Sequence, residues 1–519
     1  MKTLKSYVCG AWYEASGGFA TLIDPSTEEP IARAASDGID FAAALTHART
    51  QGAPALRAKN FAARGEMLKA MSKVIKENRD ELLELSRLNT GTTKPDGSFD
   101  IDGGAGTLAY YAVLLKTLGD RPYLTAGEGV QLAKTEGFWG HHALVPKQGV
   151  AVHVNAFNFP LWGFAEKAAC ALGAGMPMIV KPATATALVT ERALELILSS
   201  GAVPEGALQL ICGGTGNLLE LLGPQDVFAF TGSADTALAL KSGSNLLEAA
   251  TRINIEADSL NAAVLAPDVA PGSPAFDLFI KDVAREMTQK TGQKCTAVRR
   301  ILVPDALLAA VTAALTARLA AVVPGNPAES SVTMGPLATM KQLADAVSGV
   351  AKLKTAARVV FGTGERIDGT GSPAGKGAFF GPTLLSADDA WNAAVIHRHE
   401  VFGPVATLLP YDGTAAAAAG LVALGGGTLV TSVYGDDEGW LGTFLAGAGP
   451  TTGRVYIGSA GSAAEAPGSG IALPQTLHGG PGRAGGGAEL AGLAGLEPYL
   501  QKVALQGERG LVERLVGMG

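Results

Sequence analysis

The sequence predicts an α/β protein with two parallel sheets, each covered by helices on both faces. The chain has 519 residues, more than one hydrophobic core usually organises, so at least two domains are expected. Strand-like and helix-like segments alternate from about residue 149, and a second alternating set begins after about residue 268. Such alternation is typical of parallel strands joined by right-handed crossover helices, which build doubly wound sheets.

The first set contains four buried strands, predicted at 149–154, 178–180, 208–211 and 227–230. Helical spacing predicts helices at 160–173 and 186–200, and another after Ser233. Residues 41–89 also have helical periodicity and are expected to pack on the outside of this sheet. The tract Gly213-Gly-Thr-Gly216 is only a partial phosphate-binding pattern, which we interpret as a turn.

The second set begins with a helix at 276–291, followed by a strand at 298–303 and a long helix at 306–322. The longest uncharged stretch, 413–435, is broken by three glycines. It therefore predicts a helix, a turn and a strand rather than a membrane span. The Gly/Pro-rich tract 458–487 has few large apolar side chains, so we expect it to lie over the other domains as an ordered loop or to be partly mobile.

Composition excludes several classes of protein. The net charge is −7 with Lys and Arg scattered along the chain, so no basic face for nucleic acid is expected. The four cysteines (9, 170, 212 and 295) show neither disulfide pairing nor metal-ligand spacing, which predicts no metal site and a reducing compartment. The first twenty residues lack the apolar run of a signal peptide. We therefore expect a cytoplasmic protein with no membrane partner.

Two tracts carry candidate catalytic groups. Thr291-Gly-Gln-Lys-Cys295 places a cysteine after a helix, beside Lys294. A reactive thiolate needs an electropositive, accessible pocket, although a lone cysteine is more often an inert core residue. Arg252-Ile-Asn-Ile-Glu256 places a carboxylate in an apolar strand, where it is either a buried ion-pair partner or a general base with a raised pKa.

Two further tracts are candidates for cofactor binding. Lys181 ends a predicted parallel strand, where doubly wound sheets bind their ligands, although it could equally be a solvated strand end. Phe230-Thr-Gly-Ser233 precedes a predicted helix, whose first amides and Ser233 could hold a pyrophosphate. A plain serine N-cap is the alternative.

Six motifs occur in order along the chain: Asn155-Ala-Phe-Asn-Phe-Pro160, Lys181-Pro182, Phe230-Thr-Gly-Ser233, Glu256, Gly292-Gln-Lys-Cys295 and His399-Glu-Val-Phe-Gly-Pro404. Together they resemble the aldehyde dehydrogenase superfamily over nearly the whole chain. The resemblance implies a dinucleotide-binding domain at 1–126 and 149–268, a catalytic domain at 269–473, and oligomerisation segments at 127–148 and 474–519. In the family such segments form an arm that extends a neighbouring subunit's sheet, so a homodimer is the smallest expected assembly.

The resemblance also implies roles for individual residues. Cys295 matches the nucleophile that adds to the aldehyde, and Asn158 matches the side-chain donor that stabilises the oxyanion together with the Cys295 amide. Glu256 matches the base that activates water to hydrolyse the thioester. The remaining matches are a lysine near the active site (Lys167) and the cofactor-binding positions Lys181, Phe230, Gly232, Ser233, Glu400 at the nicotinamide ribose and Phe402 beside the nicotinamide.

One departure from the family concerns the cofactor. NAD-preferring relatives commonly carry a glutamate three residues after Lys181, where this chain has Thr184. A carboxylate would repel the 2′-phosphate of NADP, whereas Thr184 could donate a hydrogen bond to it. We therefore predict that NADP is preferred and NAD is also accepted. A second departure is His399, where many relatives have glutamate, and we have no physical account of it.

The C-terminal tracts 473–487 and 499–506 carry a narrower resemblance. They are similar to the dehydrogenase half of the ring-opening enzyme of phenylacetate degradation and to freestanding dehydrogenases of aerobic benzoyl-CoA oxidation. This implies 3,4-dehydroadipyl-CoA semialdehyde, an aldehyde tethered to coenzyme A, as substrate. The alternatives are a dehydrogenase of unconjugated medium-chain aldehydes, a CoA-acylating dehydrogenase and a non-catalytic protein. Glu256 argues against the acylating enzyme, because thiolysis needs no activated water, and intact Cys295 argues against the non-catalytic protein.

Three residues are weaker candidates. Glu166 and Glu497 could each be a second carboxylate near the substrate tunnel that relays protons or controls Glu256, or an ordinary exposed or paired carboxylate. His478 could contact the substrate or be solvated in its glycine-rich loop.

Overall fold

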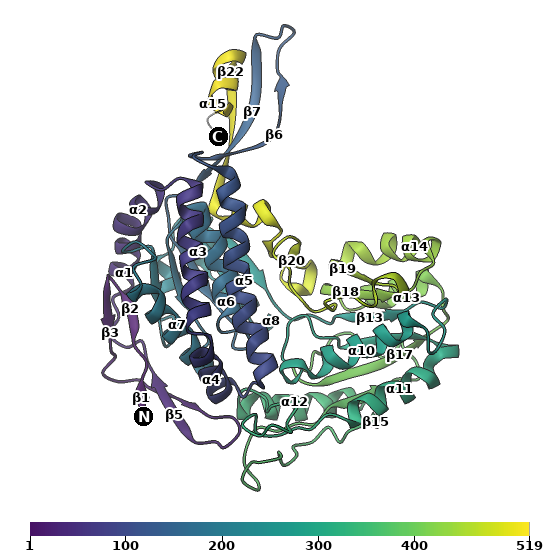
Figure 1. Cartoon of the computed structure of the whole chain (residues 1–519). Helices are drawn as coiled ribbons and strands as arrows, with labels where there is room; N and C mark the ends of the chain where they lie inside the picture. Colours follow the sequence, from purple (N-terminus) through teal and green to yellow (C-terminus); the bar gives the residue numbers. More distant parts are fainter. Residues whose placement is uncertain (518–519) are drawn as a thin grey trace.

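The computed structural model describes residues 1–517, which form two seven-stranded sheets and a projecting three-stranded arm (Figure 1). The first sheet has the order β12-β11-β8-β9-β10-β2-β3. Its parallel strands are β8 (Ala151–Val154), β9 (Met178–Lys181), β10 (Leu208–Leu210), β11 (Val227–Thr231) and β12 (Arg252–Glu256), and its antiparallel edge is β2 (Ser6–Val8) and β3 (Ala11–Tyr13). The strand order reverses between β8 and β11, and ligands of such sheets bind at this point.

Helices cover both faces of the first sheet. On one face a large apolar core joins α3 (Phe61–Glu77), α4 (Arg79–Thr90), α5 (Lys94–Leu118), α6 (Trp162–Ala174) and α7 (Ala187–Ser199). On the other face the core includes α1 (Phe41–His47) and α8 (Ala234–Lys241). The four strands predicted from apolar runs are confirmed within about two residues, as is the helical packing of residues 41–89 on the outside of the sheet.

The second sheet has the order β15-β16-β17-β14-β13-β18-β19 and is parallel except for the β15–β16 pair. Its strands are β13 (Ala262–Leu265), β14 (Arg300–Pro304), β15 (Arg358–Phe361), β16 (Thr383–Ser386), β17 (Val405–Tyr411), β18 (Thr428–Tyr434) and β19 (Thr452–Gly458). One face is covered by α10 (Pro274–Thr288) and α11 (Leu308–Ala320), the other by α12 (Met340–Leu353), α13 (Ala415–Ala423) and α14 (Glu438–Ala448). The helix, turn and strand predicted at 413–435 are confirmed as α13 and β18.

One predicted boundary differs from the structure. The division at 268/269 assigned residues 262–265 to the first unit, but β13 pairs with β14 and β18 in the second sheet. The change of sheet therefore lies between Glu256 and Ala262. An apolar strand has the same sequence pattern in either sheet, so periodicity could not locate this change.

The arm consists of β6 (Leu124–Gln131), β7 (Phe138–Pro146) and β22 (Leu500–Glu508), followed by α15 (Arg509–Gly517). β7 lies in the middle and pairs antiparallel with both neighbours, so β6 and β22 are edges. In Figure 1 the arm extends away from both sheets. Several large apolar side chains on it are exposed, among them Val130, Phe138, Val145 and Val503. An excursion at 127–148 that joins the last residues in an antiparallel arm is thus present.

The Gly/Pro-rich tract is more ordered than a loop. It contains β20 (Leu477–Gly479), which lies between the two sheets (Figure 1) and forms a short hairpin with β21 (Ala488–Leu490), directly after the tract. A Cβ at Gly480 would overlap the backbone of Thr428, so the glycine is needed for this close approach. The remaining short elements are β1 (Lys2–Thr3), β4 (Ala20–Ile23) and β5 (Pro30–Ala34), which form a small sheet, and helices α2 (Ala53–Arg57) and α9 (Ser244–Glu248). Among residues 1–517, no helix has both the length and the hydropathy of a membrane span.

Candidate active site

Cys295 follows a tight turn after α10. Lys290, Thr291 and Gly292 all have positive φ angles of 53°, 55° and 66°. The first two are strained for residues with a side chain, at a cost of about 1–3 kcal/mol each. Thr291 Oγ1 offsets part of this strain by donating to the Gly335 carbonyl at 2.9 Å. A Cβ at position 292 would overlap the backbone of Gly403, so only glycine fits there.

The buried Asn261 side chain holds the loop that carries Cys295. Its amide nitrogen donates to the carbonyls of Cys295 at 2.7 Å and Ala297 at 3.0 Å. Its oxygen accepts from the Val430 amide at 3.0 Å and from the Ser259 hydroxyl. All the hydrogen-bonding capacity of this amide is therefore used, and the cysteine loop is fixed to the start of β18.

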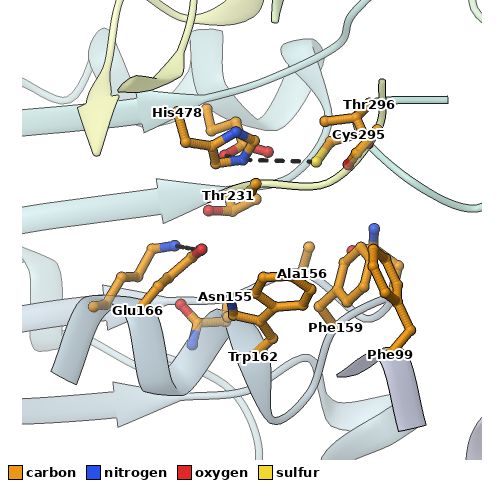
Figure 2. Close-up of a pocket in the computed structure, with 16 residues that line it drawn as sticks. Phe99, Asn155, Ala156, Phe159, Trp162, Glu166, Thr231, Cys295, Thr296 and His478 are labelled. Atoms are coloured by element: carbon orange, nitrogen blue, oxygen red, sulfur yellow. Dashed lines mark hydrogen bonds and ion pairs between the residues drawn. The ribbon is translucent and has the colours of Figure 1, made fainter. Parts of the chain in front are cut away.

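Three functional side chains from distant elements meet at the thiol. Glu256 is the last residue of β12 and His478 lies in β20. His478 Nε2 is 3.0 Å from Glu256 Oε2 and 3.9 Å from Cys295 Sγ. Figure 2 shows the His478 ring facing the thiol. His478, considered from sequence as either a substrate contact or a solvated loop residue, is buried beside both reacting groups.

The charges of this group are coupled. Burial favours the neutral form of Glu256, but His478 and Lys167 outweigh it and hold the pKa of Glu256 at about 2. The raised pKa predicted for a general base is therefore wrong, and Glu256 is the buried ion-pair partner of the alternative interpretation. Burial likewise opposes the charge on His478, yet Glu256 raises the pKa of the imidazole above its usual value. Burial, and then the Glu256 carboxylate, raise the pKa of the Cys295 thiol. Ionisation of Glu256 and protonation of His478 therefore favour each other, while burial and the carboxylate both favour the neutral form of the Cys295 thiol.

The expectation that Lys294 makes the thiol pocket electropositive is wrong. The Lys294 ammonium is fully buried and donates to Glu286 at 2.5 Å and Gln289 at 2.8 Å, in an ion pair of its own. Residues adjacent in a turn point in different directions, so sequence neighbourhood did not predict the charge around Cys295. The charge that reaches the thiol comes from Glu256.

A second buried charge cluster lies behind this group. Lys167 Nζ, on α6, is 3.0 Å from Glu166 Oε1 and 3.1 Å from Glu489 Oε2. The other Glu489 oxygen accepts from Asn254 at 3.1 Å. Burial raises the pKa of Glu166 to about 7, although Lys167 opposes this shift. Glu166 lines the cavity beside the thiol, where a proton-relaying carboxylate was predicted.

Glu497 is the ordinary exposed carboxylate of the second alternative, and its predicted place in the substrate tunnel is wrong. Its side chain is exposed and lies outside the cavity, and its carbonyl accepts from Arg252. Glu489, not singled out from the sequence, occupies the predicted place. It stands directly opposite His478 in the β20–β21 hairpin, and cross-strand partners share one face of a sheet. The sequence did contain a signal for this pair: a polar residue on each side of a glycine-rich turn, as in a hairpin. We interpreted the tract as a loop and therefore did not predict the pairing.

A cavity of about 50 Å³ opens on one side of Cys295. Its wall opposite the thiol is aromatic, with Phe99, Phe159 and Trp162 packed edge to face (Figure 2). Asn158 also lines this cavity, and its amide donates one hydrogen bond, to the Gln293 carbonyl at 3.0 Å. A side-chain amide has two N–H donors, so a second remains for a bound molecule.

A larger cleft of about 610 Å³ reaches Cys295 from the other side, at the reversal of strand order in the first sheet. Its walls include the predicted cofactor residues Phe230, Gly232, Ser233, Glu400 and Phe402. A Cβ at Gly232 would overlap the Phe230 ring, which explains the glycine. The two cavities share six residues around the thiol: Asn155, Ala156, Asn158, Thr231, Glu256 and Cys295.

Several predicted cofactor residues already have partners within the protein. Ser233 caps α8 by accepting from Thr236 N, as in the simpler interpretation, and Asp258 accepts from Ala234 N at 2.8 Å. The amides at the start of α8 are therefore only partly available. The Glu400 carboxylate is 3.0 Å from Arg299 Nε and accepts from Ser259 N.

Lys181 and Thr184 do not line the cleft, whose wall here is Ala183. Lys181 Nζ donates to the Pro182 carbonyl and Thr184 Oγ1 to the Gly213 carbonyl. By contrast, the buried amide of Asn155 and the hydroxyl of Thr231 have no hydrogen-bond partner among residues 1–517. Both line the cleft, and buried polar groups left free of protein partners fit a polar ligand.

Comparisons with known proteins bear on this site. A family model described as the aldehyde dehydrogenase family matches residues 12–501. A 3,4-dehydroadipyl-CoA semialdehyde dehydrogenase of Aromatoleum evansii is 45% identical over 478 residues, covering 92% of this chain and 93% of that protein. Among solved structures, a betaine aldehyde dehydrogenase of Staphylococcus aureus in complex with NAD+ is 25% identical with a TM-score of 0.82, covering 97% of this chain and 94% of that one. A lactaldehyde dehydrogenase has a TM-score of 0.83 at 23% identity, covering 97% and 99%.

The charge cluster behind the thiol predicts a pH dependence of stability. Burial raises the pKa of Glu166 from its ordinary 4.5 to about 7, so the folded chain binds more protons between these values than the unfolded chain. Its contribution is present below about pH 4.5 and is lost as the pH rises through 7. Glu166→Gln should therefore reduce the fall in unfolding free energy between pH 5 and 8, by up to about 3 kcal/mol.

This difference can be measured by urea unfolding of both proteins at several pH values. Glu438→Gln, at an exposed carboxylate of α14, is the matched control and should leave the pH dependence unchanged. Parallel stability curves for wild type and Glu166→Gln would contradict the assignment.

Proposed function

The chain belongs to the aldehyde dehydrogenase family, and we propose that it uses the Cys295 thiol to oxidise a coenzyme A-linked semialdehyde to its acid. The oxidation of aldehydes follows from the family match over residues 12–501. One observation carries the assignment of Cys295: its thiol lies where the two cavities meet, beside Glu256 and Asn158. An aldehyde in the smaller cavity and a cofactor in the cleft would then approach the same sulfur from opposite sides.

The first step needs a base for the thiol. The Glu256 carboxylate and the neutral form of the His478 imidazole both lie within reach of Cys295, and either can take its proton as sulfur attacks the aldehyde carbon. The oxyanion formed would be stabilised by the free N–H of Asn158 and the Cys295 amide, at about 3 kcal/mol per donor. A nicotinamide held in the cleft would supply the hydride acceptor, and loss of hydride from the adduct would leave a thioester on Cys295.

Hydrolysis of the thioester is assigned to Glu256. With Cys295 acylated, the carboxylate and its partner His478 face a cavity that has room for water. Glu256 would take the proton of the attacking water, and the cluster of Glu166, Lys167 and Glu489 lies behind it to receive charge or protons. A carboxylate positioned to activate water is expected in an enzyme that releases an acid rather than a coenzyme A thioester.

Binding of a nicotinamide dinucleotide is supported by the cleft at the switch point of the first sheet. Phe230, Gly232, Ser233, Glu400 and Phe402 would hold it. Preference for NADP rests on residue 184, because a threonine leaves the 2′-phosphate without a repelling carboxylate. NAD remains an acceptable second cofactor on the same argument.

The name of the 45% identical relative supports 3,4-dehydroadipyl-CoA semialdehyde as substrate. The aromatic wall of Phe99, Phe159 and Trp162 suits the apolar acyl chain of such an aldehyde. A cytoplasmic location agrees with a mechanism that requires a reduced cysteine.

We also infer a homodimer, formed through the arm. Its edge strands β6 and β22 carry unpaired backbone groups, and Val145 and Val503 are 38% and 40% exposed on strands of this sheet. Edges and exposed apolar side chains of this kind are usually covered by another chain.

Kinetics of two variants test the catalytic assignment. With 3,4-dehydroadipyl-CoA semialdehyde, Cys295→Ser should lose NADP reduction by more than about 1,000-fold, because no nucleophile remains. Glu256→Gln should give one rapid turnover per site and then a steady state slowed by about 100-fold or more, because the thioester accumulates. Stopped-flow absorbance of the reduced cofactor separates the two phases.

Cys9→Ser, at an exposed cysteine far from the site, should behave as wild type. Absence of the rapid phase in Glu256→Gln would show that Glu256 acts in a step before hydride transfer, which would contradict its assignment to thioester hydrolysis. A hexanal rate equal to that with the CoA-linked aldehyde would overturn the substrate proposal, while leaving the catalytic residues in place.

Substitution at 184 tests the cofactor proposal. Thr184→Glu should raise the KM for NADP by roughly tenfold or more, since two negative groups would approach each other, while the KM for NAD falls or stays constant. Thr184→Val keeps the shape of the threonine side chain and introduces no negative charge, so it should retain the NADP preference. Steady-state kinetics with both cofactors measure this, and a wild-type preference for NAD would refute the proposal.

Light scattering after size-exclusion chromatography tests the dimer. Placing charge on the arm in Val145→Glu/Val503→Glu should shift the mass from dimer toward monomer at micromolar concentration, because like charges would meet in the interface. The neutral double variant with threonine at both positions should remain dimeric. A wild-type mass equal to one chain would reject the inference.

A further inference from the structure

The three groups nearest the reacting position form a donor set that suits a soft divalent cation. Cys295 Sγ, His478 Nε2 and a Glu256 oxygen all lie within 4.8 Å of one another. The same ring nitrogen faces both other donors, at 3.0 Å from the carboxylate and 3.9 Å from sulfur. Because one atom of the ring faces both partners, a single ion placed between the three can be shared by all of them.

We propose that this cluster binds Zn²⁺ reversibly and that the bound ion holds the enzyme inactive. In a tetrahedral zinc site built from one thiolate, one imidazole and one carboxylate, the donor atoms lie about 3.3–3.6 Å apart. Two of the present separations, 3.0 and 3.9 Å, lie within about 0.3 Å of that range. The third donor pair lies within 4.8 Å, so rotation of the side chains would bring all three to one ion. The fourth position would face the cavity beside the thiol, which has room for a water molecule.

Charge and ligand chemistry favour this ion. A thiolate and a carboxylate balance the two positive charges of Zn²⁺, so the occupied site is neutral inside a buried region. Thiolate and imidazole select zinc over Mg²⁺ or Ca²⁺, which prefer oxygen ligands. Among residues 1–517, no other cluster of three or more His, Cys, Asp or Glu side chains brings its donor atoms this close.

Binding of Zn²⁺ changes the protonation of its ligands but no oxidation state. The Cys295 thiol releases its proton to solvent as sulfur coordinates the ion. His478 likewise releases any proton on Nε2, because only the neutral ring offers its nitrogen lone pair. Sulfur bound to zinc no longer attacks an aldehyde, so the effect is inhibition that a chelator reverses. The binding site does not depend on the proposed function, whereas the inhibition does.

Calorimetry of the metal-free full-length protein with ZnCl₂ tests the site without any turnover. We expect one Zn²⁺ per chain, and a Kd raised by at least about tenfold in Cys295→Ser and in His478→Gln. Cys9→Ser removes the exposed thiol and should bind as wild type. His141→Gln/His142→Gln, which removes the adjacent pair of histidines on the arm, should also bind as wild type.

Cobalt provides a second readout. Bound Co²⁺ should show thiolate charge transfer in wild type and Cys9→Ser and lose it in Cys295→Ser. Circular dichroism checks that each variant is folded. If His478→Gln is misfolded, His478→Asn is used in its place. Absence of zinc binding in wild type, or binding unaffected by both His478 variants, would overturn the proposal. Zinc binding in a protein that oxidises no aldehyde would retain the site and reject the function.

Discussion

One buried amide, that of Asn261, fixes the thiol on which the rest of the site depends. It joins the Cys295 loop to the start of β18, and both belong to the second sheet. Glu256 ends β12 and Asn158 follows β8, both strands of the first sheet. Asn158 contacts the cysteine loop through the carbonyl of Gln293, which links the two units at the reacting atoms. The chemistry therefore requires both sheets in one fixed arrangement, and a local change at Asn261 would act on all of it.

The buried ionisable groups form a balanced set. Each of the three carboxylates (Glu166, Glu256 and Glu489) is within 3.1 Å of a cationic partner, Lys167 or His478. Desolvation of so many charges would be destabilising if any partner were missing. In a buried region of low dielectric constant, the same charges act strongly on one another. This explains why burial alone does not decide the pKa of Glu256.

The sequence predicted most of the fold and the chemical centre of the site. Apolar runs located the parallel strands because both faces of these strands are buried, and a carboxylate in an apolar strand identified Glu256. The sequence could not assign β13 to its sheet, because a run of apolar residues does not show which strands it pairs with. Nor could it find Glu489, which meets Lys167 across 322 positions of the chain. Glu497, a candidate for the tunnel, lies at the surface, and Lys294 turns away from the thiol that it precedes.

The β20–β21 hairpin places a further restriction on the chain. His478 and Glu489 are opposite each other and share one face of the ribbon. Successive side chains of a strand alternate between faces, so a slip of one residue would turn both groups away from Cys295 and Lys167 together. An inserted or deleted residue here would thus remove two site groups at once, while single replacements remove one at most. We expect this segment to diverge among homologues by substitution while its length stays constant.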